Sequence, residues 1–139
     1  MSASTKLSTA VKALCYLSKV YPEPKSSSEI AKFTGVNASK LRKILSMLVK
    51  SDIVRSINGS TGGFILIKDP TQLHLQEIYC SIEDRKAFYL DVNKNHKTEN
   101  DITKLNHFFL DLFADIQVDI EDKMSKINLK SIIEEISIK

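Results

Sequence analysis

Residues 26–50 read SSSEIAKFTGVNASKLRKILSMLVK, and this stretch decides the fold of the N-terminal half of the chain. Ser26 and Glu29 have the spacing of a capping box, in which each side chain accepts a hydrogen bond from the other residue's backbone. A short helix is therefore expected to begin after Ser26, with the side chains of Ile30 and Phe33 buried.

A turn and a second helix complete this pattern. Thr34-Gly35 ends the first helix, and Asn37 is a natural N-cap for a helix over residues 38–50. The apolar side chains of the second helix form one stripe, made of Leu41, Ile44, Leu45 and Leu48. Serine, lysine and arginine occupy most of its remaining surface. A short glycine-containing turn between two helices, the second with a basic outer face, is typical of a DNA-binding helix-turn-helix.

A β-hairpin is predicted directly after this unit. Residues 53–57 and 64–67 are apolar, β-branched runs of strand length. Between them, NGSTGG at 58–63 supplies glycines for the positive φ angles of a hairpin turn. A hairpin in this place is a wing, whose tip can approach the DNA backbone or minor groove. Asp69-Pro70 then ends the second strand.

The flanking segments are predicted to be helical. Residues 7–20 form an apolar helix that a Tyr-Pro-Glu-Pro sequence ends. Residues 73–83 form another, and its inward side is made of Leu75, Ile78 and Ile82. The polar stretch 91–101 is expected to be a mobile loop. Asn128 caps a last short helix.

A long helix is predicted from about residue 102 to 124. Its apolar residues alternate at three and four positions, as Ile102, Leu105, Phe109, Leu112 and Ile116. Because the head has little surface left to cover so apolar a helix, we expect these residues to form a dimerisation seam. An effector pocket lined by its phenylalanines is the alternative.

The fold class is therefore mostly α with a small β-hairpin wing. Residues 1–70 are expected to form a winged helix-turn-helix head. Residues 71–139 are expected to form a linker helix, the loop and a helical dimerisation segment. Charge follows the same division, because residues 1–70 hold 11 Lys/Arg and 4 Asp/Glu, while residues 71–139 hold 9 and 13. A net +7 against −4 suggests that the first half binds a polyanion.

Composition excludes several classes of protein. A hydrophobic content of 42% with 27% charged residues is ordinary for a soluble globular chain. No apolar run approaches the ~20 residues that span a bilayer. Two cysteines are too few for a disulfide framework and suit a reducing compartment, so a cytoplasmic protein is expected.

Neither a catalytic nor a metal site is predicted. The GSTGG segment lies in a hairpin rather than before a helix, and His74, His96 and His107 have no ligand-like spacing. Cys15 lies on the apolar side of its helix and is expected to be a buried small hydrophobe. Cys80 lies off its helix's apolar stripe and is the better candidate for a thiol sensor, ahead of Cys15.

Stretches along nearly the whole chain together resemble the Rrf2-type bacterial transcriptional regulators. They are KLSTAVKALCYL, SSSEIAKFTGVNASKLRKILSMLVKSDIVRSI, NGSTGGFILIKDP, LHLQEIYCSIED and NLKSIIEEI. The most specific element is GSTGGFILIKDP, followed at the expected distance by the LHLQEIY helix. The resemblance implies a homodimer whose long helices cross, with two winged heads that read a roughly palindromic site.

The resemblance also implies a DNA-reading role for residues 37–43 and for the wing tip, 58–61. With the residues chosen by pattern, the candidate DNA-binding set is Ser28, Asn37, Ala38, Ser39, Lys40, Arg42, Lys43, Arg55, Asn58, Gly59, Ser60 and Thr61. Many family members carry arginine just before the first wing glycine. This chain has Asn58 there, which puts insertion of a cation into the minor groove in doubt.

Iron–sulfur members of that family carry three closely spaced cysteines after the wing helix. This half of the chain contains only Cys80, so no iron–sulfur cluster and no other cofactor is expected. The expected function is a homodimeric, sequence-specific transcriptional regulator, a repressor rather than an enzyme, whose effector the sequence does not indicate. The alternatives are a winged-helix adaptor that binds protein, a thiol-based redox sensor with little direct DNA role, and a small thiol-dependent redox enzyme.

Overall fold

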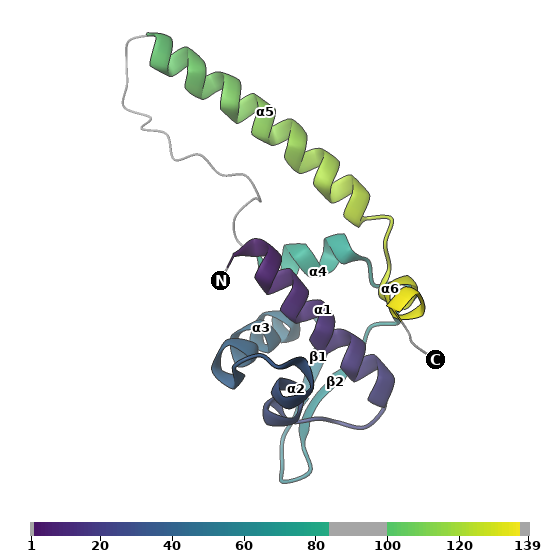
Figure 1. The fold of residues 1–139 in the computed structure, drawn as a ribbon. Helices are drawn as coiled ribbons and strands as arrows, with labels where there is room; N and C mark the ends of the chain where they lie inside the picture. Colours follow the sequence, from purple (N-terminus) through teal and green to yellow (C-terminus); the bar gives the residue numbers. More distant parts are fainter. Residues whose placement is uncertain (1, 84–99, 137–139) are drawn as a thin grey trace.

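The computed structural model describes residues 2–83 and 100–136 (Figure 1). In chain order these ranges contain α1 (Ala3–Val20), α2 (Ser27–Thr34), α3 (Ala38–Lys50), β1 (Val54–Ile57), β2 (Gly63–Leu66), α4 (Leu75–Ile82), α5 (Asp101–Met124) and α6 (Leu129–Ile136). The two strands pair as an antiparallel hairpin among the helices. The predicted fold class, mostly α with a small hairpin wing, is confirmed.

The helix-turn-helix forms as its local sequence predicts. The Ser26 hydroxyl accepts a hydrogen bond from the backbone N of Glu29, and the Glu29 carboxylate accepts one from the backbone N of Ser26. Gly35 ends α2 in the left-handed conformation, with a φ of 73°, which glycine adopts without steric cost. Asn37 is the N-cap of α3. Both helix boundaries therefore follow from residues inside the unit.

The wing is attached to the segment that precedes α2. Lys25 and Phe64 exchange two backbone hydrogen bonds, of 3.0 and 2.7 Å. Gly63, with a φ of 152°, permits this approach, because a Cβ there would lie 2.4 Å from the carbonyl carbon and oxygen of Lys25. The hairpin is therefore held in place beside the helix-turn-helix.

One hydrophobic core joins residues from both sides of position 70. Its largest fully buried side chains are Leu14, Leu17, Ile30, Leu41, Ile44, Leu45, Leu48, Ile53, Leu73, Ile78, Ile82 and Leu129. The stripe predicted for α3 is buried completely. Leu129 of α6 belongs to the same core, so the C-terminal end of the described chain packs on the head.

Several details differ from the sequence-based prediction. Helix α1 begins four residues earlier than expected, because the Ser2 hydroxyl accepts a hydrogen bond from the backbone and caps it. Phe33 is 55% exposed rather than buried, and it stacks on Tyr16 with ring centroids 4.4 Å apart. In α4, Tyr79 is buried while Leu75 is only partly buried.

The N-terminal end of helix α5 lies far from the head, and its C-terminal end lies near it (Figure 1). Near that end, Gln117 Nε2 donates a buried hydrogen bond of 3.3 Å to the hydroxyl of Tyr79 on α4. Further on, the backbone N of Leu129 donates to the carbonyl oxygen of Leu73 at 2.8 Å. The wing tip and the far end of α5 lie at opposite ends of the molecule (Figure 1).

The loop predicted over 91–101 lies almost entirely outside the described residues, and Asp101 at its end opens α5. None of the helices in the two described ranges combines the length and the apolar character that crossing a bilayer requires.

Candidate nucleic-acid interface

Helix α3 presents a polar and basic surface on the side opposite the core. Ser39, Lys40, Arg42 and Lys43 are exposed, while Leu41 between them is fully buried. This separation follows from the helical period, which places the apolar residues on one side of the axis. The α3 side chains selected from the sequence therefore lie on accessible surface.

The start of α3 is organised by Asn37. Its Oδ1 accepts hydrogen bonds from the backbone N of Ser39 at 2.8 Å and of Lys40 at 3.4 Å. These bonds satisfy two of the donors that the first turn of a helix leaves unpaired. Asn37 is exposed and Ala38 is partly exposed, and Ser28 is exposed on the first turn of α2. Asn37 therefore combines a structural role with a position on the predicted DNA-reading surface.

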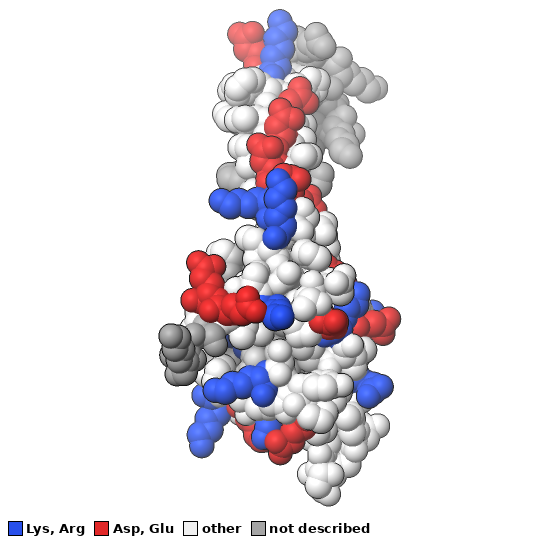
Figure 2. Space-filling model, turned by 90° about the vertical axis from the view of Figure 1, so that its right-hand side faces the viewer, with Lys and Arg blue, Asp and Glu red and all other residues white. Residues whose placement is uncertain are grey.

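The wing tip is accessible and uncharged. Asn58, Gly59, Ser60 and Thr61 are all exposed, and a hydrogen bond of 3.1 Å from Gly62 N to Gly59 O closes the turn. The tip forms the white lobe at the bottom of Figure 2. Arg55 is exposed on β1 and is the single Lys or Arg residue in the hairpin sequence 54–66. A cationic contact from the wing therefore depends on Arg55.

Three of the four acidic side chains of residues 1–70 are engaged locally, and the fourth, Asp52, is exposed and has no ion pair or side-chain hydrogen bond within the described residues. Lys25 Nζ lies 3.6 Å from the Glu23 carboxylate and 3.5 Å from that of Glu29. Asp69 Oδ1 accepts hydrogen bonds from Thr71 N at 2.9 Å and Thr71 Oγ1 at 2.8 Å. Hydrogen bonds from neighbouring backbone and hydroxyl groups hold the pKa of Glu29 and of Asp69 below their ordinary values.

Unlike Lys25, the cations of α3 and β1 are not engaged in this way. Lys40, Arg42, Lys43 and Arg55 form no ion pair with any residue of 2–83 or 100–136. Their charge is therefore available to a polyanion, as the charge division along the chain suggested.

Two further cations lie outside the predicted DNA-binding set, although Lys50 belongs to the helix whose outer face was expected to be basic. Lys32 in the last turn of α2 and Lys50 at the end of α3 are exposed and have no ion pair within the described residues. Lys32 lies four positions after Ser28, so the helical period places both on one side of α2. That spacing was a usable signal.

Neither thiol has the environment of a reactive cysteine. Burial raises the pKa of the partly buried Cys15. Cys80 is exposed, as expected, but its Sγ donates to Glu121 Oε1 at 3.6 Å, and partial burial followed by the charge of Glu121 raises its pKa. A raised pKa lowers the thiolate fraction at neutral pH and with it the nucleophilicity of the sulfur.

The residues expected at a dimer seam remain accessible on α5. Ile102 is 65%, Leu105 50% and Leu112 39% exposed, and Phe109 and Ile116 are partly buried. An edge contact between Phe108 and Phe109 and a tilted contact between Phe109 and Phe113 form an aromatic row on the same helix. An acidic row runs along α5 at the top of Figure 2, formed by the exposed Asp111, Asp115, Asp119 and Asp122.

The sequence of this chain is similar to a known protein family and to two relatives from Bacillus subtilis. The model of the Rrf2 family, described as iron-dependent transcriptional regulators, matches residues 3–135. YwnA of Bacillus subtilis (strain 168), by name a candidate HTH-type transcriptional regulator, is 30% identical over 122 residues, which are 86% of this chain and 90% of YwnA. YwgB of the same strain, named in the same way, is 30% identical over 90 residues. These cover 64% of this chain and just over half, 58%, of YwgB.

Solved structures show the same fold. A transcriptional regulator from Lactobacillus plantarum matches with a TM-score of 0.81 and 20% identity, over 94% of this chain and 88% of that one. T. potens IscR matches with a TM-score of 0.70 and 22% identity, over 96% and 86%. A basic helix-turn-helix, a wing and a projecting helix are thus found together with a family match over nearly the whole sequence. The chain belongs to the Rrf2 family of transcriptional regulators.

Proposed function

We propose that this protein is a homodimeric, sequence-specific DNA-binding repressor that works in the cytoplasm without an iron–sulfur cluster. In this proposal the head, residues 1–70, reads DNA and residues 71–139 join two copies. The observation that carries it is the exposed, unpaired set of cations on α3 and β1, while the carboxylates of Glu23, Glu29 and Asp69 are already ion-paired or hydrogen-bonded.

A mode of DNA binding follows from the geometry of α3. A helix fits the major groove, where short polar side chains can reach base edges and cations can contact phosphates. Ser39 and Asn37 supply the short polar groups, and Lys40, Arg42 and Lys43 supply the cations. The wing adds Arg55 and the uncharged residues 58–61 beside the backbone. Two heads about one helical turn apart would then read a roughly palindromic operator.

A second copy is the proposed cover for the apolar side of α5. Leu105 and Leu112 lie one heptad apart and are exposed, as is Phe108 at 59%. Exposed apolar side chains in such a row favour association with a like helix. The aspartate row of α5 would remain in solvent.

The family description includes iron, and the residues of this chain do not fit an iron–sulfur cluster. The whole sequence contains two cysteines, and they lie on different helices, Cys15 on α1 and Cys80 on α4. No group of three or more His, Cys, Asp or Glu side chains suited to a metal ion occurs within the described residues. Cysteine-ligated clusters use four thiolates, or two thiolates and two histidines on separate irons. We therefore derive no function through a cluster.

Two alternatives to direct DNA binding find less support. A thiol sensor needs a reactive thiolate, and both thiols have a raised pKa. A protein-binding adaptor would use the apolar side of α5, but it leaves the unpaired cations of α3 without a role.

The test is a mobility-shift titration with the DNA upstream of the protein's own gene, at 50 and 200 mM salt. If six to ten phosphates are neutralised per dimer, the affinity should fall by roughly 10³–10⁵-fold between these two concentrations. The double variant Lys40→Ala/Arg42→Ala should lose most of the binding while keeping the thermal stability of the unchanged protein. Removal of two exposed cations from the other half, in Lys104→Ala/Lys126→Ala, is the matched control and should preserve binding. Binding that ignores the α3 variant would refute the proposed reading helix.

A further inference from the structure

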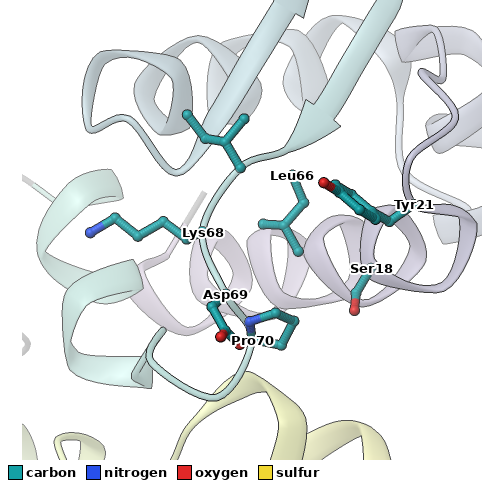
Figure 3. Close-up of a pocket in the computed structure, with 7 residues that line it drawn as sticks. Ser18, Tyr21, Leu66, Lys68, Asp69 and Pro70 are labelled. Atoms are coloured by element: carbon teal, nitrogen blue, oxygen red, sulfur yellow. The ribbon is translucent and has the colours of Figure 1, made fainter.

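An open cavity of about 350 Å³ lies between the end of α1 and the base of the wing. The end of α1 contributes Ser18, and Tyr21 follows directly after that helix. Leu66 at the end of β2, Asp69 and Pro70 line the other side (Figure 3). The volume falls in the range of natural small-molecule sites, and we call this space the wing-base cavity.

The lining combines apolar surface with a few polar groups. Pro70 offers apolar surface and Ile67 is 43% exposed at the rim, while Leu66 is a core residue only 2% exposed. The hydroxyls of Ser18 and Tyr21 form no hydrogen bond with any residue of 2–83 or 100–136. Polar and apolar residues thus share this lining, and the hydroxyls without a protein partner remain available to hydrogen-bond a ligand.

Lys68 and Asp69, the two charged residues that line the cavity, differ in whether another side chain already pairs with their charge. Lys68 extends away from Ser18 and Tyr21 in Figure 3 and forms an ion pair with Glu77 of α4. The Asp69 carboxylate has hydrogen bonds to Thr71 through Oδ1 only, so Oδ2 forms none within the described residues. The lowered pKa of Asp69 keeps this carboxylate ionised at neutral pH. The positive charge of Lys130 also acts on Asp69 but forms no ion pair with it within the described residues, so the Asp69 carboxylate is the unpaired charge left for an occupant.

The cavity also lies between the wing strand β2 and a residue that is hydrogen-bonded to α6. Leu66 is the last residue of β2, so the cavity adjoins the wing. The carbonyl oxygen of Pro70 accepts a hydrogen bond of 3.1 Å from the backbone N of Lys130 in α6. An occupant would thus contact the end of α1, the end of strand β2 and Pro70, the residue that is hydrogen-bonded to α6.

We propose that the wing-base cavity binds a small organic cation with an apolar body, and that this ligand is an effector of DNA binding. Its ammonium or guanidinium group would face the Asp69 carboxylate, with the Tyr21 ring and the two hydroxyl oxygens as further acceptors. Its apolar body would lie on Ile67 and Pro70. Only the effector role rests on the proposed DNA function, because binding itself can be measured without DNA.

The binding test compares three probes of one shape and different charge: 2-phenylethylamine, 2-phenylethanol and 3-phenylpropanoate. In amide chemical-shift titrations of the full chain, the amine should bind and shift the signals of residues 66–69. The alcohol and the carboxylate should bind about tenfold more weakly or not at all, because they lack the charge-assisted hydrogen bond. Equal binding of the three probes, shifts located elsewhere, or no binding of the amine would overturn the site.

Two variants test the role of the named side chains. Asp69→Asn keeps an oxygen for the Thr71 hydrogen bonds and should weaken amine binding about tenfold or more. Tyr21→Leu removes the aromatic ring from an exposed position and should also weaken it. Asp111→Asn on α5 is the matched control for loss of one carboxylate and should bind the amine normally. Unaltered binding by Asp69→Asn would reject the carboxylate as the recognition group.

The effector role is tested by the same mobility shift with and without saturating amine. The amine should change operator affinity for the unchanged protein and not for Asp69→Asn. If operator binding is normal and the amine leaves it unaltered, the effector role fails and the proposed function stands. If no specific DNA binding occurs at all, the proposed function fails, while the titration still decides whether the site exists.

Discussion

Gly63 carries the close backbone approach between the wing and the segment before α2, and its substitution should be costly. At this residue, alanine would have a positive φ of 152° and a Cβ 2.4 Å from the Lys25 carbonyl carbon and oxygen. Gly59 offers a matched comparison, because its φ is also positive, at 112°, but no atom lies within 4 Å of a Cβ there.

We therefore expect Gly59→Ala to reduce the free energy of unfolding by about 1–2 kcal/mol through backbone strain alone. Gly63→Ala should cost roughly 1–3 kcal/mol more, because two backbone segments must also separate. Urea denaturation of both variants measures the difference. Equal losses would show that the contact between the wing and Lys25 does not contribute to stability.

Single residues also show where local patterns fail. Phe33 falls at a position that the period of α2 predicts to be buried, yet it is 55% exposed and covers Tyr16 instead. Tyr79 was not expected in the core, but it is buried, and its hydroxyl accepts a hydrogen bond from Gln117. Both outcomes depend on an element that is distant in sequence, which a local pattern cannot include.

At the scale of elements, α2 should be the acid-sensitive helix of the head. Hydrogen bonds from the Ser26 backbone and hydroxyl, with the charge of Lys25, lower the pKa of Glu29 from its ordinary value of 4.5. A carboxyl whose pKa is lowered on folding stabilises the fold above the unfolded pKa, and this contribution disappears as the pH falls through the folded pKa.

Glu29→Gln retains an oxygen for the capping box but does not titrate. Its free energy of unfolding should therefore depend less steeply on pH than that of the unchanged protein between about pH 6 and about pH 3. Thermal unfolding across this interval, in buffers of equal ionic strength, makes the comparison. Parallel curves for the two proteins would mean that the capping box does not contribute to acid sensitivity.

Elements whose ends are set by residues close in the sequence agree with their predicted bounds. The bounds of α3 were expected at 38–50 and are found there, because Asn37 caps the helix and its apolar stripe is uninterrupted. The strands differ by a residue at their ends, because ladder pairing and not propensity decides where a strand begins. The predicted DNA-reading residues of α3 share a surface for the same helical reason, but which of them contact bases stays a prediction.

At the scale of the whole molecule, the exposed apolar side of α5 should control the oligomeric state. Leu112→Glu places a charge in the middle of this side, where Leu105 and Phe108 are also exposed. Burial of an unpaired charge is unfavourable, so the variant should be monomeric by sedimentation velocity.

Operator affinity should then fall by roughly 10²–10⁴-fold, because two linked heads no longer bind together. Asp111→Ala alters the neighbouring residue, which belongs to the acidic row, and should remain dimeric with unaltered affinity. A Leu112→Glu protein that still sediments as a dimer would exclude α5 as the seam.

The sequence by itself determined the helix-turn-helix, the wing and the long apolar helix. Capping, glycine turns and hydrophobic periods act between residues that are close along the chain, so their outcome can be read locally. The resemblance to Rrf2-type regulators, now confirmed, rested on the same segments.

Only the tertiary structure decided how these elements meet. Three features join segments that are far apart in the chain. They are the backbone hydrogen bonds between Lys25 and the wing, the packing of Leu129 in the core of the head, and the cavity between Tyr21 and Asp69. Such contacts depend on the packing of several elements at once. No spacing within one segment encodes them, because the free energy that selects them comes from surfaces buried jointly in the folded chain.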